Sequence, residues 1–116
     1  MTTPLHLRQS ERQFQQAVME YAQARGWMVM HIRPARTGRT RTNKQGEERE
    51  VWDTPYEGDP GFPDLVLVRS GRVWLFELKS ERGAVTNAQE KWLNAAEGHG
   101  AVLRPSDWPQ IEEVLK

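Results

Sequence analysis

The chain has 116 residues, which favours a single domain (1–116) with one modest core. Its hydrophobic share of 37% and charged share of 28% exclude a disordered or collagen-like chain, and no run approaches the roughly 20 apolar residues that a membrane helix needs. There is no cysteine, which excludes disulfides and thiolate zinc sites, and a formal net charge of zero gives no overall attraction to nucleic acid.

The chain begins with a predicted helix and a predicted strand. Ser10 and Gln13 have the form of a capping box, and the apolar residues that follow recur at helical spacing. This pattern predicts a helix over about 10–25, ended by Gly26. The bulky apolar run Trp27–Ile32 is typical of a strand.

A charged segment follows. Residues 33–49 hold six arginines and lysines and two glutamates, a net charge of +4, whereas residues 50–59 hold four acids and no base. The whole stretch 33–63 is rich in Gly, Pro, Thr and charge, so we expect a long loop there, with a short strand or turn near Val51 and Trp52.

The second half of the chain predicts a hairpin and two helices. Leu65–Val68 and Val73–Lys79 are apolar runs joined by a Ser-Gly turn, which indicates an antiparallel pair. Thr86 and Gln89 form a second capping box, ahead of a helix that ends at Gly98. The remaining elements are a short strand over 101–104 and a last helix capped by Ser106 or Asp107. This order predicts an α/β fold in which helices flank a central sheet.

The hairpin brings an acid and a base together. Side chains alternate along a strand, so Glu77 and Lys79 share one face, and the hairpin register places Asp64 opposite Glu77. Two carboxylates about 4 Å apart repel by roughly 4 kcal/mol at an effective dielectric near 20. Taken singly, the stretch 58–64 is typical of a turn and the Glu-Lys pair of a solvated surface, but their combination indicates a site for a hard cation such as Mg²⁺ or Mn²⁺.

The same residues carry a resemblance to a known family. "PD" at 63–64, twelve intervening residues and "ELK" at 77–79 resemble the motif of the PD-(D/E)XK nucleases. Within that superfamily the chain resembles the small virus-type replication-repair nuclease (VRR-NUC) modules, with "SERQFQQAVMEYAQARGWMVMHIR" before the motif and "TNAQEKWL" after it. The resemblance covers about residues 10–104.

The resemblance implies a restriction-endonuclease-like αβββαβ core with a mixed sheet, and metal-dependent hydrolysis of phosphodiester bonds. It implies that Asp64, Glu77 and the backbone carbonyl of Leu78 bind Mg²⁺, for which Mn²⁺ substitutes, and that Lys79 is the catalytic lysine. It also implies an acid from the first helix, which matches Glu11, with Glu20 as the competitor.

Two further polar residues fall near this motif. Gln89 matches a glutamine that the family often places near the site, and it serves equally well as the capping partner of Thr86. His31 lies on the same face of the first strand as Trp27 and Val29, and we expect a structural histidine there.

The charged segment suits contact with a nucleic acid backbone. Its arginines are interleaved with small polar residues, a pattern that favours phosphate contacts over base readout. We hypothesise that the loop tracks the DNA backbone and becomes ordered on binding. The expected nucleic-acid-binding residues are Arg33, Arg36, Arg39, Arg41 and Lys44.

These expectations combine into a cytoplasmic, bacterial or phage-encoded, Mg²⁺-dependent DNA endonuclease that cuts branched or four-way junction DNA. Each chain offers one site, so paired cuts require a homodimer, for which Trp108 or the hairpin supplies the contact. The alternatives are a sequence-specific restriction-type or viral-genome-processing nuclease, and a non-catalytic nucleic-acid-binding subunit.

Overall fold

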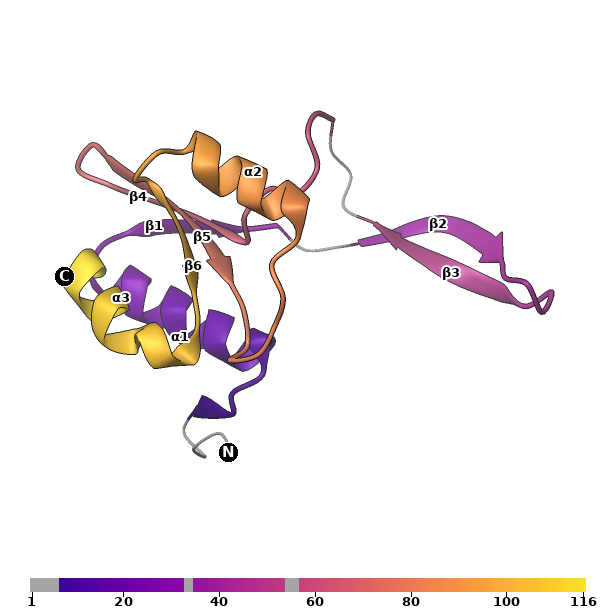
Figure 1. Ribbon diagram of the computed structural model, residues 1–116, viewed down its shortest axis with the longest axis horizontal. Coiled ribbons are helices and arrows are strands. Elements are labelled where there is room, and N and C mark those ends of the chain that lie inside the picture. The colour runs from indigo at the N-terminus through magenta and orange to yellow at the C-terminus, as the bar shows by residue number, and fades with distance from the viewer. Residues whose placement is uncertain (1–6, 33–34, 54–56) are drawn as a thin grey trace.

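The computed structural model describes residues 7–32, 35–53 and 57–116 (Figure 1). The elements, in chain order, are α1 (Glu11–Ala24), β1 (Met28–His31), β2 (Ala35–Thr42), β3 (Glu48–Asp53), β4 (Leu65–Arg69), β5 (Arg72–Leu78), α2 (Asn87–Ala95), β6 (Gly100–Leu103), the short 3-10 helix η2 (Pro105–Asp107) and α3 (Trp108–Leu115).

One four-stranded mixed sheet organises the molecule, with strand order β1-β4-β5-β6. The first two pairings are antiparallel, and β5 pairs with β6 in parallel. Figure 1 shows α1 and α3 together on one side of this sheet and α2 on the other. The fold is therefore α/β, with an αβββαβ core (α1, β1, β4, β5, α2, β6), as the sequence predicted.

The main core lies between the sheet and the layer of α1 and α3. Sheet and helix side chains that are almost fully buried meet there, and fully burying such a side chain stabilises the fold by about 1.5–3 kcal/mol. They include Phe14, Val18, Leu65, Leu67, Phe76, Leu78, Ile111 and Leu115. Trp108, which was considered as a dimer contact, is partly buried, with its ring centroid 5.5 Å from that of Tyr21.

Both predicted capping boxes are present. The Ser10 hydroxyl accepts a hydrogen bond from the Gln13 amide at 3.1 Å, while the Gln13 side chain accepts from the Ser10 amide at 3.0 Å. Thr86 and Gln89 repeat the arrangement at the start of α2. These exchanges satisfy helix amides that have no partner within the helix, so both helices begin where the sequence predicted.

The β4–β5 hairpin has the register that the sequence predicted. Its turn residues Ser70 and Gly71 have φ values of 49° and 79°, the two positive angles that a tight type I′ hairpin requires. Leu65 pairs with Phe76, so the next position outward brings Asp64 opposite Glu77. This register sets the geometry of the site described below.

Residues 33–63 were expected to form a long loop, and that expectation is wrong for most of the stretch. β2 and β3 pair with each other as an antiparallel hairpin, and β3 includes Val51 and Trp52, where a short strand was considered. Its turn is organised by Asn43, whose side-chain oxygen accepts hydrogen bonds from the amides of Gln45 and Glu47, both at 2.9 Å. Figure 1 shows this ribbon projecting from the body of the molecule.

Across the described ranges, no helix has the length and apolar character needed to cross a membrane.

Candidate metal and nucleic-acid site

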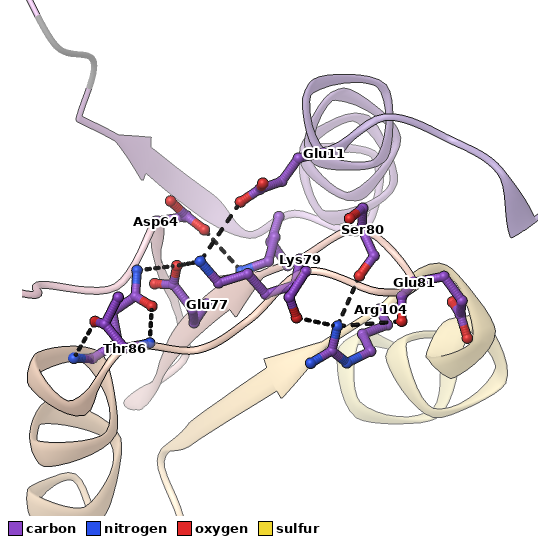
Figure 2. Close-up of polar contacts among 11 residues, drawn as sticks. Glu11, Asp64, Glu77, Lys79, Ser80, Glu81, Thr86 and Arg104 are labelled. Carbon is purple, nitrogen blue, oxygen red and sulfur yellow. Dashed lines mark hydrogen bonds and ion pairs between the residues drawn. The ribbon is translucent and has the colours of Figure 1, made fainter.

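The candidate site lies at one end of the central sheet. The last residue of β1, His31, pairs with the first residue of β4, Leu65, and Leu65 in turn pairs with Phe76 near the end of β5. The starts of α1 and α2 reach the same end of the sheet (Figure 2). Five elements therefore bring side chains to one place.

Three carboxylates meet there. Glu11, Asp64 and Glu77 each offer one oxygen, and these oxygens all lie within 4.8 Å of one another. Glu11 stands in the first turn of α1 with its side chain 50% exposed, Asp64 precedes β4, and Glu77 is on β5. Hard oxygen donors at this spacing are the ligand type that Mg²⁺ and Mn²⁺ prefer.

Asp64 is held by the strand next to it. The backbone amide of Leu78 donates a hydrogen bond to the Asp64 Oδ2 atom at 2.8 Å. In an extended strand the N–H and C=O of one residue point to the same side, so the Leu78 carbonyl is directed to the side on which Asp64 lies. The next amide, that of Lys79, points the other way and donates to the Leu103 carbonyl at 3.0 Å.

Glu77 is the most buried member of the cluster, with only 1% of its surface exposed. Its Oε1 atom accepts a hydrogen bond from the Gln89 side chain at 2.8 Å. Its Oε2 atom is fully buried and has no hydrogen-bond partner within the described part of the chain. Burial, followed by the nearby Asp64 carboxylate, raises the pKa of Glu77 to about 7, while the Lys79 ammonium acts in the opposite direction.

Lys79 stands between two of the acids. Its Nζ atom lies 3.4 Å from Glu77 Oε1 and 4.0 Å from Glu11 Oε1, and its side chain is 12% exposed. Figure 2 shows the ammonium group pointing into the acidic cluster. The site thus combines three carboxyl groups with one ammonium group. When the carboxyl groups are ionised, their excess negative charge attracts a further cation.

Gln89 has both of the roles that were considered for it. Its side-chain oxygen accepts from the Thr86 amide at 2.9 Å and so caps α2. Its side-chain nitrogen is the group that donates to Glu77. The side-chain amide of Gln89 therefore caps α2 and also orients the Glu77 carboxylate.

Several expected residues lie elsewhere. Glu20 is exposed on α1, where it accepts a hydrogen bond from Gln16 at 2.9 Å, and it is not part of the cluster. His31 has a structural partner, since its Nδ1 atom lies 3.1 Å from the Asp64 carbonyl oxygen. The expected DNA-contacting residues fall in three places: Arg33 lies outside the described residues, Arg36, Arg39 and Arg41 are positions of β2, and Lys44 is exposed in the turn of that ribbon.

The sequence analysis did not predict the role of Arg104, which stabilises a loop next to the site. Arg104 donates from Nη1 to the carbonyl oxygens of Gly83 at 2.7 Å, Ser80 at 2.8 Å and Glu81 at 3.4 Å (Figure 2). These carbonyls belong to the loop that connects β5, which carries Glu77, to α2, which carries Gln89. No local signal marks this contact, because its partners lie 21 to 24 residues away in the sequence.

No known protein family, curated protein or solved structure matches this chain.

Proposed function

We propose that this protein is a metal-dependent DNA endonuclease that hydrolyses phosphodiester bonds, as its resemblance to the VRR-NUC modules implies. The observation that carries the proposal is the buried, unpartnered Oε2 atom of Glu77, set beside the carboxylates of Glu11 and Asp64. Leaving a buried polar oxygen without a partner is costly, and a divalent cation bound by the three acids would remove that cost.

The residues present fit such a cation. Asp64, Glu77 and Glu11 would hold it, together with the carbonyl of Leu78. When bound, Mg²⁺ or Mn²⁺ activates water and neutralises charge that develops on a phosphate. Lys79 then stabilises the developing negative charge, and Gln89 keeps the Glu77 carboxylate in position.

The β2–β3 ribbon supports DNA as the substrate. Its two strands carry four arginine positions, Arg36, Arg39, Arg41 and Arg49, and Arg41 pairs with Arg49 in the register. Arginine forms strong charge-assisted hydrogen bonds with phosphate groups. The major groove of duplex DNA admits a two-stranded ribbon, and the ribbon is inserted between β1 and β4, whose paired ends border the acidic cluster. We therefore propose that the ribbon holds a DNA backbone beside the site.

The experiment is cleavage of supercoiled plasmid and of a synthetic four-way junction, with Mg²⁺, with Mn²⁺ and with chelator. We expect metal-dependent cleavage that falls at least about 100-fold in Asp64→Asn and Lys79→Ala. Glu11→Gln and Glu20→Gln are a matched pair on one helix, and only the first is expected to lose activity.

Cleavage that persists in chelator, or in both Asp64→Asn and Lys79→Ala, would contradict the proposed site. DNA binding without cleavage under any condition would identify a non-catalytic binding subunit instead. Discrete cuts in linear duplex DNA, with no preference for the junction, would point to a restriction-type enzyme.

A further inference from the structure

A pocket of about 630 Å³ opens beside the acidic cluster. It lies between the segment 57–64, the end of β1 and the side of α2, and Asp64 belongs both to its lining and to the carboxylate cluster. Its size is within the range of pockets that bind small organic groups, about 300–1,000 Å³. Whatever occupies this pocket is therefore adjacent to the proposed metal ligands.

The aromatic part of the wall is held in place. Phe62 is 38% exposed, and its ring meets that of Trp92 edge to face, with centroids 4.9 Å apart. The Trp92 indole N–H is bonded to the carbonyls of Pro60 at 3.0 Å and Asp59 at 3.3 Å. Gly61 has φ +89°, and a Cβ atom built on it would lie 2.5 Å from the Ala88 backbone, so this segment packs tightly on α2. Phe62 thus presents an aromatic surface that is partly open to solvent and already ordered.

Three acidic residues, Glu57, Asp59 and Asp64, are among those that line the pocket. These groups repel a phosphate but accept hydrogen bonds from the amino and ring N–H groups of a nucleobase. His31 also lines the pocket, and because its Nδ1 atom contacts a carbonyl oxygen, that nitrogen carries the proton.

We propose that this pocket binds one nucleobase, turned out of the base stack, of the DNA strand whose phosphate lies at the acidic cluster. The base stacks on Phe62 and directs its N–H groups to the carboxylates, while its backbone stays outside. This inference rests on the proposed nuclease function and extends it, because an unstacked base is available in single strands and at distorted junctions but not in perfect duplex.

The test is a cycle of two proteins and two oligonucleotides. Binding of an eight-nucleotide thymidine strand and of an abasic strand of the same length is measured by fluorescence anisotropy, at low salt with chelator so that nothing is cut. Phe62→Ala should weaken thymidine-strand binding by about 5- to 150-fold, the range of base–aromatic stacking, and leave abasic-strand binding unchanged. Phe62→Trp should retain the wild-type preference.

Phe62→Leu keeps an apolar side chain against Trp92 and so separates stacking from folding; it should behave like Phe62→Ala. Equal binding of the two strands by the wild type, an equal loss for both strands in Phe62→Ala, or binding of neither strand would overturn the inference. A pocket that serves a peptide or a metabolite would give one of these results. Plasmid cleavage with Mg²⁺, measured separately, distinguishes the base-binding pocket from the proposed nuclease function. Cleavage of plasmid by a protein that binds the two strands equally would contradict only the base-binding pocket. Preference for the thymidine strand without any cleavage would contradict only the nuclease function.

Discussion

Glu77 holds its carboxyl group in a place from which water is nearly excluded. One of its oxygens is bonded to Gln89 and the other has no partner in the part of the chain that the structure describes. Burial, followed by the neighbouring Asp64 carboxylate, favours the protonated form of Glu77 and raises its pKa from 4.5 to about 7.

This shift predicts how stability depends on pH in chelator. Because the folded-state pKa lies above the unfolded value, the folded chain keeps a proton that the unfolded chain has released. The stabilisation is complete below about pH 4.5 and is lost as pH rises through about 7, a total of about 3 kcal/mol. Urea unfolding of the wild type and of Glu77→Gln between pH 4.5 and 8 measures it, and the variant should lack this component. Identical pH profiles for the two proteins would contradict the prediction.

At this scale the sequence was informative where a local rule applied. The hairpin register placed Asp64 opposite Glu77, because a two-residue turn leaves one pairing possible. The contacts of Gln89 with Thr86 and Glu77 could be anticipated from the capping rule, because that rule fixes the Gln89 side chain at the start of α2. The contact of Arg104 could not be predicted in this way, because its side chain reaches the loop carbonyls only when β6 lies beside β5.

The sequence analysis missed β2 and its pairing with β3, although it considered a short strand or turn near Val51 and Trp52, which lie in β3. Ala35–Thr42 mixes arginines with small residues and has no large apolar residue, so the period-two hydrophobic signal of a strand is absent. An isolated two-stranded ribbon is marginally stable by itself.

If the ribbon follows the DNA backbone, its arginines govern the salt dependence of binding. With about five phosphate contacts, the slope of log affinity against log salt should be near −4.5. Replacing Arg36, Arg39 and Arg41 with glutamine should make that slope shallower by about 2.7. Binding of a short duplex in chelator, measured over a range of salt concentrations, gives both slopes. Lys116→Gln, which removes one positive charge at the far terminus, is the control and should leave the slope unchanged. An unchanged slope in the triple variant would exclude the ribbon as the contact.

At the scale of the whole molecule, one face of the central sheet is only partly covered by the residues that the structure describes. α2 lies over the part near β6, while Met28 on the edge strand β1 is 77% exposed. Met28 pairs with Val68, and Val68 with Val73, so these apolar residues form a row across three strands. Val68 and Val73 are 39% and 40% exposed.

We expect this row to form the contact of a homodimer, since an edge strand and a flanking apolar row can be shared by two copies around a two-fold axis. Sedimentation equilibrium should give about twice 13.4 kDa for the wild type. Met28→Lys combined with Val73→Lys should give a single chain without loss of helix content by circular dichroism. Gln110→Lys, which adds a lysine at an exposed position of α3, should remain dimeric. A monomeric wild type at micromolar concentration would exclude this assembly.

The close approach of Gly61 to Ala88 has a consequence for tolerance to mutation. Any other amino acid there would need an unfavourable backbone angle and would also push the segment away from α2. In a saturation-mutagenesis screen, Gly61 should therefore rank among the least replaceable positions even though it has no side chain to contribute. Such a result would reflect the lack of space between two backbones.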